Sequence, residues 1–235
     1  MITKYLLTTM LIVSISISDE LIKIPEASGI DYCKDSNTLV VANDEGWIYE
    51  ITTNGKIINK KRVKKYDLEG VVCNKKNFIF VVEDKGLLKV NRQTYKSKLI
   101  KVNPMYQRTK IELFDKDRGV EGIAKGNGYY YLAKQSNKRD KSFIAVIKIE
   151  RNRADIIDII RHKIVDTAGL TYKKNNLYMV SDKKNQMIKY NIKKRKIVAK
   201  IKLDNMAQEG IAFDKDGFIY IADDNGKVIK VKSVF

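Results

Sequence analysis

Short apolar runs broken by turn residues fill the chain from about residue 19 to its end. The runs are rich in Val, Ile and Tyr, they stop at Gly, Asn or Asp, and only 2 prolines occur among 235 residues. Runs of this length and composition are typical of β-strands, and no long segment has the period of a helix. The sequence therefore predicts an all-β protein.

An internal repeat organises these runs. A small or acidic residue, a glycine and an aliphatic residue recur five times, and successive glycines are 41, 52, 47 and 41 positions apart. A period of this size fits four short strands and their turns. The five matches are Ser28-Gly29-Ile30, Glu69-Gly70-Val71, Glu121-Gly122-Ile123, Ala168-Gly169-Leu170 and Glu209-Gly210-Ile211.

Each repeat continues with a second buried strand that ends in a polar turn, and then with a third. The first four repeats also contain a fourth strand, whereas the fifth stops after three. The segment Glu20 to Ile24 precedes the first repeat and could supply the missing strand. The predicted fold is therefore a five-bladed β-propeller, one domain over residues 19–235, closed by the N-terminal strand completing the last blade.

The first 18 residues have the pattern of a secretory signal peptide. Lys4 precedes an apolar run from Tyr5 to about Val13, and Ser16-Ile17-Ser18 offers small residues for cleavage. The run is shorter than the roughly 20 residues that span a bilayer, so we expect no stable membrane span. The prediction is a cleaved signal peptide over residues 1–18 and a periplasmic or secreted protein, with an uncleaved N-terminal anchor as the alternative.

The net charge of +18 invites comparison with nucleic-acid-binding proteins. Export argues against that function, and much of the charge lies in short segments such as Lys60-Lys61-Arg62 that the repeat places on outer strands. Charges there discourage aggregation through sheet edges. We expect a monomer with a solvated basic rim and no nucleic-acid partner, and an acidic surface polysaccharide bound at that rim is an alternative.

Cys33 and Cys73 lie near the ends of the first strands of neighbouring repeats. An exported protein permits a disulfide. The two residues are one position out of phase relative to their glycines, so their side chains should leave opposite faces of their strands. The prediction is two buried free thiols.

Acidic residues gather at one end of the predicted ring. The entries to the first strands carry glutamates, and the turns between second and third strands add further acids. Crowded carboxylates repel one another unless a cation neutralises them. The candidate metal ligands are Glu69, Glu121, Glu209, Glu83 and Asp44, with Asn43, Asp84, Asp182, Asp223 and Asp224 in the same set of turns.

Calcium suits such a group best, because it takes six to eight oxygen ligands in a flexible geometry. Magnesium needs a tighter octahedron. Zinc is disfavoured because the chain has 1 histidine, His162, which the repeat places on an outer strand in a surface role. No hydrolase triad is apparent.

A structural explanation of the Glu-Gly pairs competes with the metal site. Glycine could allow a tight turn into the strand, and the glutamate could cap nearby backbone groups. The fourth repeat has Ala168 in place of the glutamate, so the acid is not a requirement of the fold.

The same motifs resemble the SdiA-regulated family of exported bacterial proteins, distant relatives of NHL-repeat propellers. The resemblance covers nearly all of the predicted mature chain. It implies a five-bladed propeller with a calcium site and no established enzymatic activity. It rests on Glu26-Ala27-Ser28-Gly29-Ile30, Ala42-Asn43-Asp44-Glu45-Gly46, Asp67-Leu68-Glu69-Gly70-Val71 with Glu83, Val120-Glu121-Gly122, and Gln208-Glu209-Gly210-Ile211-Ala212.

Two functions fit these features. The first is a non-catalytic, calcium-dependent module that binds a small ligand or an exported protein. The alternative is a calcium-dependent hydrolase of a lactone or phosphoester, in which the ion would polarise the substrate and activate water. The acidic residues alone are compatible with both.

Overall fold

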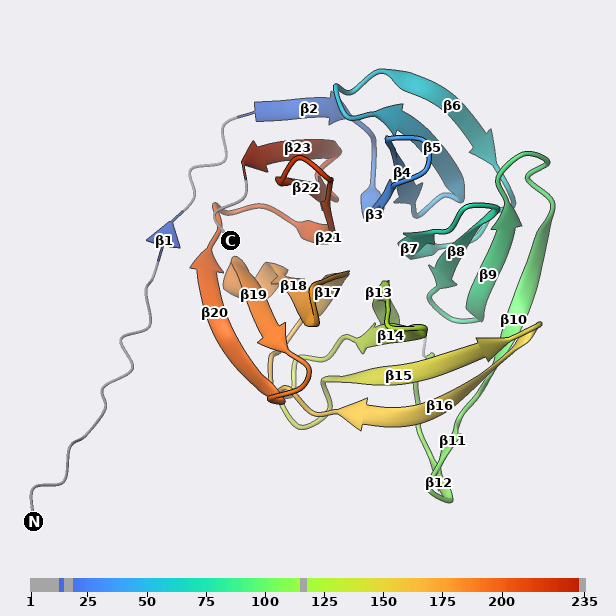
Figure 1. Ribbon diagram of the computed structural model, residues 1–235, viewed down its shortest axis with the longest axis vertical. Coiled ribbons are helices and arrows are strands. Elements are labelled where there is room, and N and C mark those ends of the chain that lie inside the picture. The colour runs from blue at the N-terminus through green and yellow to red at the C-terminus, as the bar shows by residue number, and fades with distance from the viewer. Residues whose placement is uncertain (1–12, 15–18, 115–117, 233–235) are drawn as a thin grey trace, which may run out of the picture.

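The protein is a β-propeller in a computed structural model that describes residues 13–14, 19–114 and 118–232 (Figure 1). Antiparallel strands follow one another outward from a central axis in groups of four. The first group is β3 (Ala27–Cys33), β4 (Thr38–Asn43), β5 (Trp47–Thr52) and β6 (Ile57–Arg62). The second is β7 (Leu68–Cys73), β8 (Asn77–Val82), β9 (Gly86–Asn91) and β10 (Ser97–Asn103).

The next two groups repeat this order. The third is β13 (Val120–Gly126), β14 (Tyr129–Lys134), β15 (Phe143–Glu150) and β16 (Arg153–Ile160). The fourth is β17 (Thr167–Lys173), β18 (Asn176–Ser181), β19 (Gln186–Asn191) and β20 (Lys196–Lys202), with a short 3-10 turn at Asp182–Lys184.

The last group joins both ends of the described chain. Strands β21 (Gln208–Phe213), β22 (Phe218–Asp223) and β23 (Lys227–Lys232) pair in sequence, and β2 (Asp19–Lys23) completes the sheet along β23. The predicted completion of the final sheet by the N-terminal strand is confirmed. This pairing covers the open edge that β23 would otherwise present.

Two pairings were not predicted. At the outer edge, β10 and β16 run parallel and join the second and third groups into one eight-stranded sheet. Strand β1 (Val13–Ser14) pairs with β20. These two residues fall within the predicted signal peptide, whose other residues, 1–12 and 15–18, lie outside the described part of the chain. No helix in the described part is long and apolar enough to cross a bilayer.

The innermost strands contact one another in a closed circle, in the order β3, β7, β13, β17, β21 and back to β3 (Figure 1). The repeated glycines make this circle possible. A Cβ atom on Gly70 would lie 2.6 Å from the Glu121 carbonyl oxygen, and one on Gly29 would lie 2.5 Å from the Glu69 carbonyl oxygen. Close backbone approach, and not a tight turn, is therefore why the repeat requires glycine; none of the five has a positive φ.

The core consists of apolar layers between adjacent sheets. Val40, Ala42 and Ile48 from the first group meet Val71 and Phe80 from the second, and comparable layers fill the other interfaces. Sheet faces are apolar on both sides because each is covered by a neighbour. The outer strands are the exception: every residue of β6 is exposed, including the basic segment predicted to lie there.

The cysteines form a disulfide, which corrects the prediction of free thiols. Cys33 and Cys73 are bonded across the first interface, with their Cα atoms 5.3 Å apart. Their side chains do leave opposite faces of their own strands. Adjacent sheets stack face to face, however, so opposite faces of neighbouring sheets point toward each other, and the two sulfur atoms meet within the apolar layer.

His162 also differs from its predicted surface role on an outer strand. It follows β16, its side chain is 6% exposed, and the Ile164 backbone N–H donates to Nδ1 at 3.1 Å. Burial lowers the pKa of His162 to about 4, so it is neutral at physiological pH. It is a buried structural residue.

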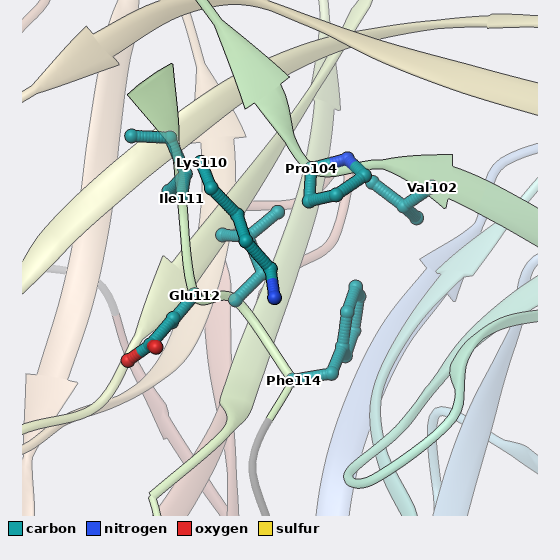
Figure 2. Close-up of a pocket in the computed structure, with 7 residues that line it drawn as sticks. Val102, Pro104, Lys110, Ile111, Glu112 and Phe114 are labelled. Atoms are coloured by element: carbon teal, nitrogen blue, oxygen red, sulfur yellow. The ribbon is translucent and has the colours of Figure 1, made fainter.

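A hairpin of β11 (Met105–Tyr106) and β12 (Thr109–Lys110) projects from the outer rim after β10. Between this hairpin and β10 lies a cavity of about 420 Å³ (Figure 2). Its lining residues come from the segment between Val102 and Phe114, which begins in the outermost strand of the second group. The cavity therefore lies away from the innermost strands. This peripheral cavity contains none of the predicted metal ligands.

The close approach at the axis predicts a large cost for adding one methyl group. Gly70→Ala should lower the free energy of unfolding by about 3 kcal/mol or more, because the new Cβ meets backbone atoms that cannot rotate away. Gly128→Ala is the control. The added Cβ would contact nothing within 4 Å, and the backbone φ is +81°. The free energy of unfolding should therefore fall by only about 1 kcal/mol, from backbone strain. Urea unfolding measures both, and an equal or smaller loss in Gly70→Ala would contradict the packing argument.

Candidate metal centre

A β-bulge places the acid of each glutamate repeat. The register of each innermost strand with its neighbour shifts at the repeat motif, between Val120 and Gly122 in β13 and between Gln208 and Gly210 in β21. The residue in the bulge is Glu121 in one strand and Glu209 in the other. A bulge re-aims a side chain relative to the regular alternation of the strand. The same shift occurs at Ala27/Gly29, Leu68/Val71 and Thr167/Leu170.

Three of the predicted ligands meet as a result. One carboxylate oxygen each from Glu69, Glu121 and Glu209 lies within 4.8 Å of the others. Glu69 and Glu121 are each 8% exposed, and Glu209 is partly buried. The corresponding positions of the other two strands hold Ser28 and Ala168. Three of the five innermost strands therefore carry an acid at this position.

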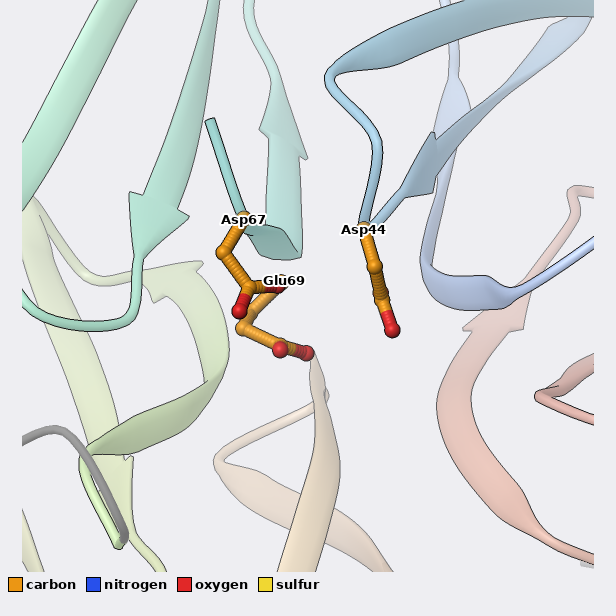
Figure 3. Close-up of side chains that lie close together, drawn as sticks. All are labelled: Asp44, Asp67 and Glu69. Atoms are coloured by element: carbon orange, nitrogen blue, oxygen red, sulfur yellow. The ribbon is translucent and has the colours of Figure 1, made fainter. Parts of the chain in front are cut away.

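A second group shares Glu69. Oxygens of Asp44, Asp67 and Glu69 also lie within 4.8 Å of one another, and their carboxylates point toward a common space (Figure 3). Asp44 comes from the turn after β4, and Asp67 immediately precedes β7. Asp44 Oδ1 is buried and has no hydrogen-bond partner among the described residues. A buried oxygen without a partner is costly unless some group binds it.

Asp67 is the member of the site that sequence reasoning missed. It lies two residues before Glu69, and the strand alternation that places residues i and i+2 on one face could have identified it. The fifth predicted ligand, Glu83, follows β8 and lies beside Asp67, with which its carboxyl shares a hydrogen bond. Glu83 therefore borders the site through Asp67.

Several other polar residues of the turns have structural roles. Asn43 Oδ1 accepts from the Glu45 N–H, and its Nδ2 donates to the Pro25 carbonyl. Asp223 Oδ1 accepts from the backbone N–H groups of Ala207 and Asn225. Asp84 pairs with Lys85. Asp182 and Asp224 contribute to the negative potential at Glu209 without joining either group of three.

Every carboxyl group of the site resists ionisation. Burial, followed by repulsion from Glu121, raises the pKa of Glu69 well above its usual value, and burial with the same neighbour raises that of Glu209. Burial raises the pKa of Glu121, Glu83 and Asp44 to about 7 in each case. None of these five forms a salt bridge with a described lysine or arginine. In the described part of the chain, these five acids are therefore concentrated without a salt bridge to neutralise them.

The raised pKa values fix the direction of a pH effect. Glu121 binds a proton below about 7 in the folded protein, but only below about 4.5 when unfolded. Stability from this group is thus complete below pH 4.5 and is lost as the pH rises through 7. In chelator, we expect the free energy of unfolding to fall between pH 5 and pH 8.

Glu121→Gln should flatten that dependence, since the neutral amide cannot ionise. Glu150→Gln is the control, because Glu150 is exposed at the end of β15 and pairs with Lys148. Urea unfolding at each pH measures the slope. A slope that Glu121→Gln leaves unchanged would mean that the crowded carboxylates do not control it.

The comparisons with known proteins agree with the architecture. No curated protein matches the chain in sequence. Among solved structures, the chain is similar to the crystal structure of Myxococcus xanthus glutaminyl cyclase, with a TM-score of 0.70 and 10% identity. The alignment covers 92% of this chain and 95% of that one. At that identity the likeness concerns the fold alone.

A family match covers the ring up to the start of its last strand, β23. The sequence matches the SdiA-regulated family over residues 14–227, a span that includes every repeat motif and every acid of the site. The resemblance inferred from the Glu-Gly motifs is confirmed, and the chain belongs to the SdiA-regulated family.

Proposed function

We propose that the protein is a five-bladed, calcium-binding propeller that serves as a non-catalytic binding module. The observation that carries the proposal is two sets of three carboxylates that share Glu69. The oxygens of each set lie within 4.8 Å of one another, and none forms a salt bridge with a lysine or arginine among the described residues. Each four-stranded group counts as one blade, and the closed circle of innermost strands supports that count.

The spacing of the oxygens is compatible with a calcium ion. Calcium binds oxygens at 2.3–2.6 Å, so two ligands on opposite sides of one ion are up to about 5 Å apart. Magnesium, at 2.0–2.1 Å, allows about 4.2 Å. Oxygens that all lie within 4.8 Å of one another are close enough to share one calcium ion. Ser28 is beside Asp44 and offers a further oxygen.

Bound calcium would complete the mouth as a binding surface. Glu69, Glu121 and Glu209 would hold the ion from the innermost strands, and Asp44 with Asp67 would hold it from the rim. A cation there would let all these groups ionise and remain in place. The ligand of the module, a small molecule or an exported protein, would then meet a surface in which the acids are neutralised.

We also propose that the protein works in the periplasm or outside the cell. The Cys33–Cys73 disulfide supports this location, because disulfides persist in oxidising compartments and are rare in the cytosol.

Calcium titration of the full chain tests the proposal. We expect one exothermic or endothermic binding event by calorimetry and a rise in melting temperature that chelator reverses. Glu69→Gln should weaken calcium binding at least tenfold, because Glu69 belongs to both groups of carboxylates. Glu150→Gln should bind like the wild type. The calcium site would be excluded if the wild type showed no heat of binding and no shift in melting temperature.

Hydrolysis of a lactone or phosphoester is the second candidate function. Its support is the convergence of carboxylates on one space, which could hold an ion that polarises a substrate and activates water. A panel of lactones and phosphoesters should then show calcium-dependent turnover that falls at least 100-fold in Glu121→Gln, while Glu150→Gln stays active. Calcium binding without turnover on the panel would favour the module.

A further inference from the structure

The other end of the axis is a pocket of about 930 Å³. It lies where the innermost strands end, whereas the carboxylates lie where those strands begin. All five strands contribute: Tyr32 at β3, Val72 at β7, Ile123 at β13, Leu170 at β17 and Phe213 at β21 line it. The pocket is thus coaxial with the candidate metal centre but separated from it by the ring of glycines.

Lysines surround this pocket in a pattern that follows the repeat. The fifth residue after the repeat glycine is lysine in four of the five units, and the third unit has Lys125 three residues after its glycine. Lys173 adds a sixth. The lining lysines are Lys34, Lys75, Lys125, Lys173, Lys174 and Lys215.

The aspartates of the pocket have other partners than these lysines. Asp35 pairs with Arg92 at 2.8 Å. Asp214 accepts from the Phe218 N–H and the Tyr220 hydroxyl, and Asp31 accepts from the Cys73 N–H at 2.7 Å. None of the six lysines forms a salt bridge with a carboxylate in the described ranges. Positive charge is therefore available to a ligand.

The pocket lining also contains apolar and aromatic side chains, called here its floor: Val72, Ile123, Leu170, Tyr172 and Phe213. Phe213 carries the Lys173 ammonium 4.3 Å above its ring, and Tyr172 stacks on Tyr131 with centroids 6.0 Å apart. Rings held this way offer a rigid surface for the carbon frame of a ligand. Converging cations above such a floor are suited to a molecule with several negative groups.

We propose that this pocket is a binding site for a small molecule carrying several phosphate or carboxylate groups. The lysines would bind the anionic groups around the mouth, and the aromatic floor would contact the rest of the molecule. The site is independent of calcium and of the acidic mouth. It also differs from general attraction to the basic rim, because it needs lysines from separate repeats to converge on one cavity.

Calorimetry with tripolyphosphate and with citrate, at physiological salt, tests the site and separates phosphate from carboxylate recognition. We expect at least one of the two to bind the full chain at one site. The variant Lys75→Gln/Lys174→Gln/Lys215→Gln removes three charges at the pocket and should weaken binding at least tenfold. The corresponding triple arginine variant should restore binding to within threefold.

The matched control removes the same charge elsewhere. Lys61→Gln/Lys98→Gln/Lys196→Gln alters exposed lysines on β6, β10 and β20 and should change affinity less than twofold. The Glu69→Gln variant should also bind the anion with normal affinity. Failure of the anion site can then be distinguished from failure of the calcium site. Equal losses in both lysine triples, or no binding of either anion to the wild type, would overturn the proposal. Unchanged melting temperatures establish that the exposed lysine variants remain folded.

Discussion

Backbone contact at the axis is the constraint on which the rest of the molecule depends. The innermost strands approach so closely that Gly29 lies against Gly70 on one side and against Gly210 on the other. Side chains larger than hydrogen would hold the sheets apart and open the ring. The residue next to each glycine must then leave the strand through a bulge. The same packing that closes the ring therefore decides which side chains meet at its mouth.

Electrostatics follows from that geometry. Glu69 and Glu121 are nearly buried at positions where the nearest charges are other carboxylates. Burial alone would favour neutral acids, and mutual repulsion acts in the same direction. A fold gains nothing from such an arrangement, since Ala168 occupies the same position in the fourth unit without disrupting its strand. The acids are therefore better explained by a ligand than by stability.

Much of the architecture was predictable because each repeat carries its own signal. Glycine spacing and alternating apolar runs located the strands, and the short fifth unit indicated that β2 would complete its sheet. The site was predicted in part, since Glu69, Glu121 and Glu209 are recognisable beside their glycines. The alternation of residues at the start of β7 could have identified Asp67, whereas the place of Glu83 beside Asp67 depends on turn geometry that no local pattern encodes. The disulfide was missed because phase within one strand says nothing about which sheet covers the face.

The two ends of the axis carry opposite charge, and this has a common origin in the repeat. An acid before the glycine and a lysine after the strand lie at opposite ends of the same short segment, so repetition collects each at its own mouth. A molecule with a net charge of +18 could have spread its acids evenly to lower self-repulsion. It instead gathers a group of buried carboxylates at one mouth, with the glycine ring between them and the pocket that six lysines line. Ligands of opposite charge would then approach opposite faces, and binding at one mouth would leave the other accessible.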